Sequence, residues 1–483
     1  MAGYKINMQK QQRKNPLALS KKNMQKVGYK VIDTIIEHLT EMESLKIHAQ
    51  QSPAYLNRIL GGKIPTKGQN PLALIEQAKQ EVFGYILHVD HPRFYAFIPS
   101  PGNFMGVMAD TLAKGFNVFN GHWLAGSGSA AVERITIDWL KEICGFPKTG
   151  GGLFLSGGSM ANLSAIATAR KIKLINEGKR GVVYYSQQTH SSLAKGLKVL
   201  GIGEKYRRPL ATDKALKIDL KALEKAIKKD IKNGLTPFCI VANAGTTNAG
   251  VVDPLKKMAK IAKKYNCWLH IDGAYGAAAM LTKKGKKAMK GIEKADSLTL
   301  DPHKWWFQPM EIGCLLVKDA NHLKTTFQVS AEYLEDTKAK GLEEINYYDH
   351  GIQLTRSFRA LKLYFSLKTF GLKAFKKAIQ KGIDMAEYTE KLLRREKNWQ
   401  IITPAQLGII NFVYAPKGAS LVEIDAASKL IAEKVMHDGF AMMTTTKINE
   451  VTVLRMCPIH PGLSKLDIRE TIRRLGLFAE EVI

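Results

Sequence analysis

The sequence is poor in cysteine and has no long hydrophobic run, and each absence excludes a class of protein. Its five cysteines are widely spaced, odd in number and form no CxxC pair. This excludes a disulfide-built scaffold and a zinc site of the usual spacing. We therefore expect reduced, mostly buried thiols and no metal. No apolar stretch reaches the roughly 20 residues that a membrane span needs, so we expect no membrane association.

A secretion signal is also missing. Residues 1–22 are polar and basic, whereas a signal peptide carries an apolar stretch of roughly 7–15 residues. Together with the scattered cysteines, this predicts a cytoplasmic protein.

Acidic residues are scarce relative to basic ones. There are 43 Asp and Glu against 72 Lys and Arg, and the net charge is +29. Such a charge permits nucleic-acid binding, but no RNP, zinc-finger or basic-zipper pattern accompanies the lysines. A solvated lysine-rich surface is the simpler explanation, so we expect no nucleic-acid partner. The positive electrostatic field of the protein still favours the binding of small anionic ligands.

What is present is an ordinary globular composition in a chain of 483 residues, 45% of them hydrophobic. Because single cores stop growing near roughly 250–300 residues, we expect two or three units. The pattern divides into a helical segment over 1–87, a large domain over 88–370 and a small α+β domain over 371–483. Helices are expected from Ser20 and over 70–87.

The large domain alternates short apolar runs with lysine-bearing helical stretches such as 253–265. Strands are predicted at 181–185, 238–242, 268–271, 297–300 and 314–317. Repeated β-α-β units imply an α/β fold with a mostly parallel sheet, whose ligands bind at the carboxyl ends of the strands. In the last domain we expect helices at 372–394, 422–438 and 465–475, and strands at 401–402, 409–414, 440–443 and 451–456.

The run DPHKWW at 301–306 directly follows a predicted strand. Partial burial lowers the pKa of a lysine and makes its amine a nucleophile toward carbonyls, so Lys304 is a candidate Schiff-base lysine. A snorkelling lysine beside core aromatics has the same local sequence.

A second candidate is Asp272, in WLHIDGAY at 268–275, 32 residues before Lys304. Catalysis by pyridoxal phosphate (PLP) uses a carboxylate on the pyridine nitrogen, because a protonated ring is a better electron sink. The spacing matches about one α-β crossover. An aspartate that caps a turn at a strand end is the alternative.

Three further segments follow predicted strands or precede helices: LSGGSMAN at 155–162, YSQQTHSS at 185–192 and NAGTTN at 243–248. The first is a glycine-rich turn before a helix, which presents backbone N–H groups to a phosphate. It matches neither the dinucleotide GxGxxG nor the P-loop spacing. The other two offer His190 and Thr246, and each alone has an ordinary loop as its alternative.

In this order, the segments resemble the group II PLP-dependent amino-acid decarboxylases, the family of aromatic-L-amino-acid and glutamate decarboxylases. The resemblance spans about 91–371. The runs HPRFY at 91–95 and RSFRALK at 356–362 add to it, and FIPS at 97–100 is closer to the aromatic branch. It implies the aspartate aminotransferase-like fold, fold type I, and a homodimer with shared active sites.

The resemblance also implies roles around the cofactor ring. Lys304 would carry PLP as a Schiff base, and Asp272 would pair with the pyridine nitrogen. Ala274 and His190 would lie against the two ring faces, and Thr246 near the 3′-oxygen. The phosphate would be held by Gly158, Ser159, Met160 and His303.

On the substrate side, Ser100, with Pro99 beside it, matches a position close to the substrate carboxylate. Tyr333 matches the acid that returns a proton to Cα, where relatives that make aldehydes tend to have Phe. His190, the other catalytic candidate, could return this proton instead. Thr355 hints at a phenolic substrate. Asp301 departs from the Asn common in animal members, and a carboxylate there would repel the phosphate.

The leading prediction is thus PLP-dependent decarboxylation of an L-amino acid, of the tyrosine, dopa or tryptophan class, to the amine and CO₂. Another PLP carbon–carbon lyase, an aldehyde synthase, or a decarboxylase of an acidic amino acid remains open on the same fold. A basic nucleic-acid binder with an idle enzyme site is the alternative from a different class.

Overall fold

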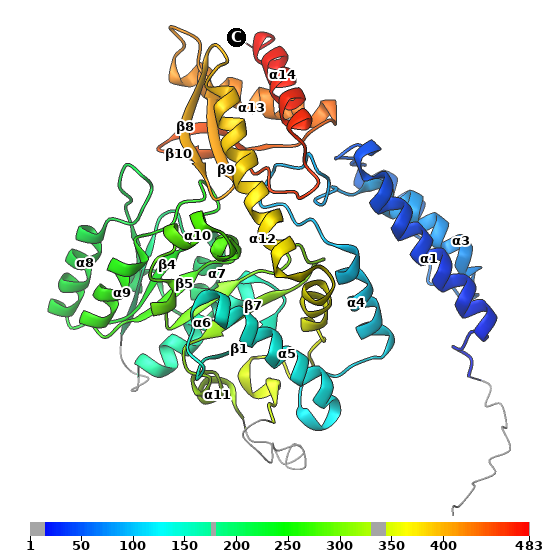
Figure 1. The fold of residues 1–483 in the computed structure, drawn as a ribbon, viewed down its shortest axis with the longest axis horizontal. Helices are drawn as coiled ribbons and strands as arrows, with labels where there is room; N and C mark the ends of the chain where they lie inside the picture. Colours follow the sequence, from blue (N-terminus) through cyan, green and yellow to red (C-terminus); the bar gives the residue numbers. More distant parts are fainter. Residues whose placement is uncertain (1–14, 175–179, 330–343, 483) are drawn as a thin grey trace, which may run out of the picture. The chain divides into compact units, whose positions relative to one another are not determined.

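The computed structural model describes residues 15–174, 180–329 and 344–482 (Figure 1). The chain divides into two compact units, Met1–His88 and Val89–Ile483. Each unit is described by itself below.

The first unit is helical. It contains α1 (Lys21–Glu41), α2 (Pro53–Leu60) and α3 (Pro71–Gln77). Ser20 caps α1, since its side chain accepts from the Asn23 amide. The helical pattern predicted over 70–87 is confirmed from Pro71 to Tyr85, but not as one regular helix: α3 ends at Gln77, and a π-helical turn and a 3-10 turn follow. Gly84 lies in that last turn, and glycine weakens a regular helix.

A seven-stranded sheet forms the centre of the second unit, in the order β1-β7-β6-β5-β4-β2-β3. Its strands are β1 (Gly151–Leu155), β2 (Gly181–Ser186), β3 (Arg207–Leu210), β4 (Thr236–Asn243), β5 (Trp268–Asp272), β6 (Ser297–Leu300) and β7 (Gly313–Val317). The helices along this part are α4 (Phe104–Gly115), α5 (Trp123–Cys144), α6 (Gly158–Lys173), α7 (Ser191–Val199), α8 (Leu220–Lys232), α9 (Leu255–Lys264), α10 (Lys283–Ala288) and α11 (Asn321–Phe327). Strands β2 to β6 pair in parallel, while β7 is antiparallel to both neighbours.

The five predicted strands of this sheet are confirmed as β2, β4, β5, β6 and β7. All five residues of β5 are buried, because helices cover both faces. Leu269 and Ile271 share a core cluster with α8 and α9, whereas Trp268 packs with α6 and α7. The sequence analysis missed β1 and β3. The latter is an edge strand of sequence RRPL, and its arginines and proline do not resemble a buried strand.

The C-terminal part has its own antiparallel sheet, in the order β10-β11-β9-β8. Its elements are α12 (Ala360–Leu393), β8 (Trp399–Gln406), β9 (Ile409–Tyr414), α13 (Leu421–Asp438), β10 (Thr444–Ile448), β11 (Val451–Met456) and α14 (Lys465–Glu480). Gly371 interrupts α12 with a left-handed backbone, φ +70°. The strand predicted at 440–443 is wrong. Met442 makes only an isolated bridge to Phe94, and pairing with β11 begins at Thr444.

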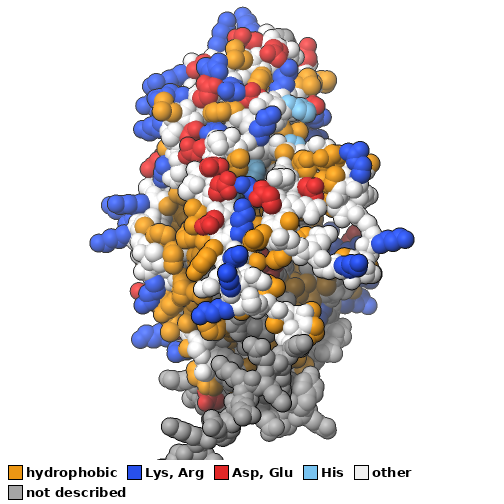
Figure 2. All heavy atoms as spheres, turned by 90° about the vertical axis from the view of Figure 1, so that its right-hand side faces the viewer, with side chains coloured by type: hydrophobic (Ala, Val, Ile, Leu, Met, Phe, Trp, Pro, Cys, Tyr) orange, Lys and Arg blue, Asp and Glu red, His pale blue; other side chains and the backbone are white. Residues whose placement is uncertain are grey.

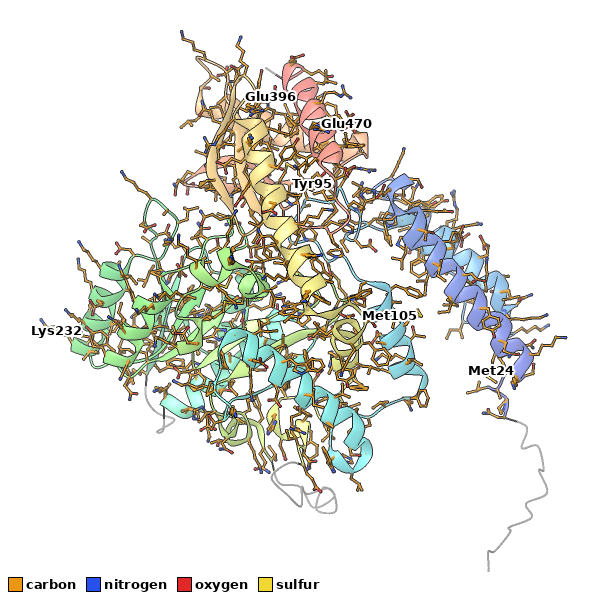
Figure 3. All side chains as sticks on the ribbon, viewed as in Figure 1. Met24, Tyr95, Met105, Lys232, Glu396 and Glu470 are labelled. Carbon is orange, nitrogen blue, oxygen red and sulfur yellow. The ribbon has the colours of Figure 1, made fainter. Side chains whose placement is uncertain are left out.

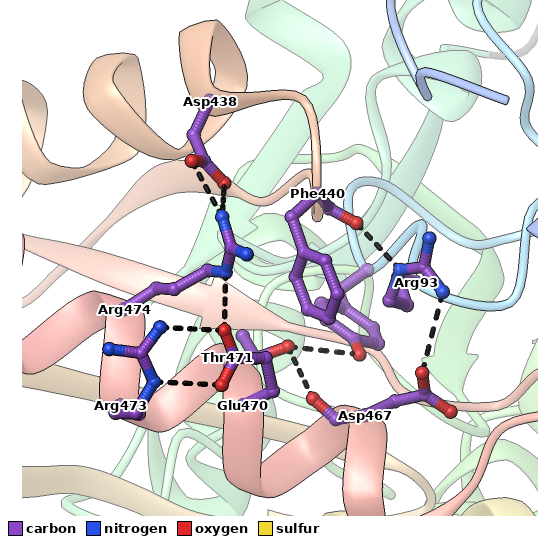
Figure 4. A network of polar contacts seen from close by, with 9 residues as sticks. Arg93, Asp438, Phe440, Asp467, Glu470, Thr471, Arg473 and Arg474 are labelled. Atoms are coloured by element: carbon purple, nitrogen blue, oxygen red, sulfur yellow. Dashed lines mark hydrogen bonds and ion pairs between the residues drawn. The ribbon is translucent and has the colours of Figure 1, made fainter. Parts of the chain in front are cut away.

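The segment at 91–95 is tied to this C-terminal part (Figure 4). Arg93 donates to the carbonyl of Phe440 at 2.8 Å and pairs with Asp467 at 3.4 Å. The fully buried Tyr95 lies beneath α14, its hydroxyl 3.3 Å from that of Thr471 (Figure 3). This segment, which carries part of the family resemblance, therefore connects the two ends of the unit.

A buried ion pair joins α5 to the chain before α12. Arg356 donates to Glu133 at 2.7 Å and to the carbonyl of Phe154 at 2.8 Å. The Phe154 amide in turn donates to Glu133 at 2.9 Å. Because both charged side chains are almost completely buried, neither can turn to water if its partner is removed.

The structure also bears on the cysteines and on the apolar character of the helices. All five cysteines are buried and unpaired, as expected. Within the described ranges, no helix has both the length and the apolar character that crossing a bilayer requires.

Replacement of Glu133 by glutamine is expected to lower the free energy of unfolding by about 3–5 kcal/mol, because it leaves Arg356 as an uncompensated buried charge. Urea denaturation followed by tryptophan fluorescence measures the change. The control is Glu224→Gln, which breaks the exposed pair with Lys264 and should leave the midpoint nearly unchanged. Equal midpoints for both variants would contradict the prediction.

Candidate active site

The parallel strands bring their carboxyl ends to one edge of the large sheet. Strand β1 ends at the same edge, since β1 and β6 are both antiparallel to β7. A cavity of about 290 Å³ lies there. Its wall is formed by Ser156, Gly157, Gly158, Ser159, Met160, Asn162, His190, Ser192, Asn243, Gly245, Thr246, Thr247, Asp272, Ala274, Tyr275, Asp301, His303, Lys304 and Glu311.

Each residue predicted to bind the cofactor lies on this wall. These residues are Gly158, Ser159, Met160, His190, Thr246, Asp272, Ala274, His303 and Lys304. They come from five connections far apart in the sequence, each of which follows a strand of the sheet.

The predicted substrate residues are placed differently. Neither Pro99, Ser100 nor Thr355 belongs to the described wall of the cavity. Ser100 is buried and its hydroxyl donates to the carbonyl of His303, while Thr355 is exposed. Tyr333 lies outside the described residues.

Lys304 sits on a tight turn between β6 and β7. The next two residues, Trp305 and Trp306, are buried in the core, and Trp305 stacks on Tyr275 at 4.9 Å between ring centroids. The buried indoles fix the turn, and Lys304 lines the cavity with its amine 2.8 Å from the Asp301 carboxylate. Burial by itself lowers the pKa of Lys304, but the negative charges of Asp301 and Asp272 outweigh it. The pKa therefore lies above that of an ordinary lysine, and the lowered pKa expected from burial alone is wrong.

Asp272 ends β5 and is held by neutral donors. One carboxylate oxygen accepts from the side-chain amide of Asn162 at 2.9 Å, and the other from the backbone amide of Ala274 at 3.1 Å. The side chain is nearly buried yet lines the cavity. A carboxylate held this way can pair with a cationic ring nitrogen.

Asn162 on α6 is a functional candidate that the sequence analysis missed. Its side-chain oxygen accepts from Thr299 at 2.8 Å and lies 3.0 Å from His270 Nε2. This fixes the amide so that its nitrogen faces Asp272. Burial lowers the pKa of His270 to about 4, so the imidazole is neutral at pH 7. The residue stands in the run LSGGSMAN, but only tertiary packing brings it to β5.

The first turn of α6 follows β1 and faces the cavity. The first amides of a helix have no intrahelical acceptor, and the helix dipole favours an anion there. Gly158 is required by packing, because a Cβ at this position would lie 2.8 Å from Asp301 Oδ2 and 3.2 Å from the Ala274 Cβ. The turn can therefore bind a phosphate close to the backbone.

Two histidines complete the wall, and both are neutral at pH 7 because burial lowers the pKa of His190 and of His303. The Nδ1 atom of His190 accepts from the Ser192 amide at 3.2 Å, and that of His303 accepts from the Ile312 amide at 3.2 Å. Each neutral ring consequently carries its proton on Nε2. His190 can stack on an aromatic ring and donate from that nitrogen.

These donors fit pyridoxal phosphate. Asp272 offers a carboxylate to the pyridine nitrogen, the first turn of α6 offers amides to the phosphate, and Lys304 offers an amine to the aldehyde. A protonated pyridine nitrogen would give the buried Asp272 carboxylate a cationic partner in the cavity. The negative charge of Asp301, which lies against the first turn of α6, opposes the phosphate.

Comparison with known proteins identifies the relatives of the chain. Residues 53–415 match the model of the pyridoxal-dependent decarboxylase conserved domain. An aromatic-L-amino-acid decarboxylase of Bacillus atrophaeus is 44% identical over 467 residues, which are 96% of this chain and 97% of that protein. Tyrosine decarboxylase 4 of Petroselinum crispum is 30% identical over 453 residues, 90% of this chain and 89% of that protein.

Solved structures share the fold. The structure of Oryza sativa TDC with PLP and tryptamine superposes with a TM-score of 0.92 at 25% identity, and the match covers 96% of this chain and 99% of that one. The predicted α/β fold of type I is confirmed by this similarity.

Truncation of Asn162 to alanine should weaken the binding of pyridoxal phosphate by about tenfold or more, since a hydrogen bond to a charged group contributes about 1.5–3 kcal/mol. Titration of the cofactor-free protein, followed by the absorbance of the bound cofactor, gives the dissociation constant. Ser164→Ala on the same helix is the control, because the Ser164 hydroxyl has no hydrogen-bond partner among the described residues. Equal dissociation constants for the two variants would refute the role of Asn162.

Proposed function

The chain belongs to the pyridoxal-dependent decarboxylase family, and on that premise we propose that it converts aromatic L-amino acids to the corresponding amines and CO₂. One observation carries the chemistry: a lysine amine, a buried carboxylate and the first turn of a helix meet in a single cavity. These are the three groups that pyridoxal phosphate requires of its protein.

In this proposal Lys304 would hold the cofactor through its amine. Asp272 would pair with the pyridine nitrogen and favour its protonated form. The amides of Gly158 and Ser159, with the Nε2 proton of His303, would bind the phosphate. Bound pyridoxal phosphate supplies the electron sink that accepts the electron pair of the Cα–carboxylate bond.

The remaining task is to return a proton to Cα. The neutral His190 lies on the cavity wall with its proton on Nε2, and this supports a role in covering the ring and orienting the carboxylate. We assign the proton donor to Tyr333, because the family resemblance gives that position to an acid. A tyrosine there favours an amine over an aldehyde as the product.

The substrate class rests on the relatives. The B. atrophaeus protein, 44% identical over nearly the whole chain, is an aromatic-L-amino-acid decarboxylase, and the P. crispum protein is a tyrosine decarboxylase. The run FIPS at 97–100, which resembles the aromatic branch of the family, supports the same class. We therefore favour aromatic over acidic amino acids.

We further propose that the active protein is a homodimer. None of the residues of α1, α2 and α3 is buried in the single chain, although these helices carry many apolar side chains. The exposed ones include Met24, Tyr29, Val31, Ile36, Leu72 and Leu74. Hydrophobic patches on one face of the molecule are visible in Figure 2. Surfaces of this kind mark interfaces, and most soluble oligomers are symmetric dimers of one chain.

We place the protein in a reducing compartment such as the cytoplasm. Five buried, unpaired cysteines support this proposal, since an oxidising compartment favours disulfides.

The proposed activity is tested with a panel of L-amino acids, with CO₂ and the organic product measured together. We expect amine and CO₂ in equal amounts from tyrosine, dopa or tryptophan, and no reaction of glutamate. Lys304→Ala should abolish turnover, whereas Lys214→Ala at an exposed position should not. Aldehyde with ammonia and peroxide would instead indicate an aldehyde synthase, and CO₂ from glutamate alone would overturn the substrate class.

The dimer is tested by sedimentation equilibrium, which should give twice the mass of the chain. The double variant Met24→Asp/Val31→Asp puts two charges on exposed apolar positions of α1 and should shift the protein toward monomer. Asn23→Asp/Gln25→Asp makes the same change in net charge at exposed polar positions and should remain dimeric. A monomeric wild-type protein would refute the proposal.

A further inference from the structure

We propose that Asp301 is a positioning residue that holds Lys304 as an ammonium ion before the cofactor arrives, and so sets the pH at which this lysine captures pyridoxal phosphate. The inference rests on the cofactor that the family uses, and it is independent of the amino acid that the enzyme decarboxylates.

The geometry of the pair is fixed by the main chain at both ends. The Lys304 amide donates to the Asp301 carbonyl at 2.9 Å, which closes the turn between the two residues, and the Asp301 amide donates to the Ala274 carbonyl at 2.9 Å. Within this turn Lys304 Nζ lies 2.8 Å from Asp301 Oδ2. Asp301 is 2% exposed, whereas the Lys304 side chain is 25% exposed where it lines the cavity. Burial of the carboxylate therefore strengthens the contact from the Asp301 side.

No other described charged group contacts the Lys304 amine. Asp272 acts on it through space, His303 and His190 are neutral at pH 7, and Glu311 on the cavity wall is engaged by Arg359 at 2.8 Å. Burial lowers the pKa of Lys304, but the charge and hydrogen bond of Asp301, helped by Asp272, raise it above the ordinary value. The amine is therefore protonated at neutral pH in the cofactor-free protein.

Protonation matters because an ammonium has no lone pair with which to attack an aldehyde. One proton must first leave Nζ, and Asp301 Oδ2 is the nearest acceptor. The new carbon–nitrogen double bond forms as the carbon–oxygen bond breaks. Two of the three ammonium protons depart with the oxygen as water, and the third stays on nitrogen. The fraction of neutral amine thus limits the capture rate.

A second observation places Asp301 against the phosphate turn. Its Oδ1 atom is buried and has no hydrogen-bond partner in the described part of the chain. A Cβ at Gly158 would lie 2.8 Å from Oδ2, and a Cβ at Gly313 would lie 2.8 Å from Oδ1. The carboxylate is packed directly beneath the turn that receives the phosphate, where its charge is balanced by Lys304.

The test measures cofactor capture by the cofactor-free, full-length protein. Pyridoxal phosphate is mixed with wild type and with Asp301→Asn at a series of pH values, and the absorbance of the bound cofactor gives the rate constant. Without the carboxylate, the midpoint of the pH profile should move to lower pH. Because an opposite charge at this distance shifts such equilibria by about one pH unit or more, the rate constant at pH 7 should rise about tenfold or more.

Glu311→Gln is the matched control, since it removes another carboxylate from the cavity wall and should leave the midpoint in place. An unchanged or raised midpoint in Asp301→Asn would overturn the proposal, and so would an equal shift in both variants. A phosphorylated analogue that lacks the aldehyde isolates the repulsion of the phosphate. The affinity of Asp301→Asn for this analogue is compared with that of wild type at each pH. If the affinity rises by the same factor as the capture rate at every pH, loss of phosphate repulsion explains the faster capture, and the proposal about the Lys304 amine is overturned.

A measurement on the wild-type protein keeps the test decisive if the variant does not fold. An amine-reactive ester labels the cofactor-free protein over the same pH range, and mass spectrometry quantifies the label on Lys304 and on the exposed Lys214. We expect the labelling midpoint of Lys304 to lie above that of Lys214. A midpoint below it would overturn the proposal. Because no amino-acid substrate is added in either experiment, the results do not depend on which amino acid the enzyme decarboxylates.

Discussion

The alignment of parallel strand ends is the constraint on which the rest of the structure depends. Strands β2, β4, β5 and β6 pair in parallel, so the connections after them meet at one edge of the sheet. Groups far apart in the sequence share one wall of a small cavity for this reason. The two tryptophans after Lys304 also help to form this wall, because their burial fixes the turn that places the Lys304 amine in the cavity.

The cavity brings several charged and polar side chains together, most of them largely buried. The Lys304 amine lies 2.8 Å from the Asp301 carboxylate, and the charge of Asp272 also acts on it. Burial keeps His190, His303 and His270 neutral, so they add hydrogen bonds without adding charge. Pyridoxal phosphate brings a cationic nitrogen and an anionic phosphate to this set. Asp272 and the first turn of α6 match those two charges.

Sequence reasoning succeeded where the local pattern reflects burial on both faces of a strand. The runs at 238–242 and 268–271 are apolar because helices cover both sides, and each is a strand of the sheet. It failed where tertiary packing, and not the local pattern, decides whether a segment pairs as a strand. The apolar segment 440–443 makes only one isolated bridge. Strand β3, in contrast, lies at the edge of the sheet and contains two arginines, so its sequence does not resemble a buried strand. The family and its cofactor, predicted from five motifs in order, are confirmed by the family model.

By itself, the sequence determined the class of protein and the identity of its reactive groups, because a lysine after a strand, an aspartate at a strand end and a glycine-rich turn each have a local signature. Only the tertiary structure decided how these groups are held. Asn162 reaches Asp272 because α6 packs across β5, and Asp301 meets the phosphate turn because β1 and β6 end together. These two contacts join residues more than a hundred positions apart, and no local pattern encodes them.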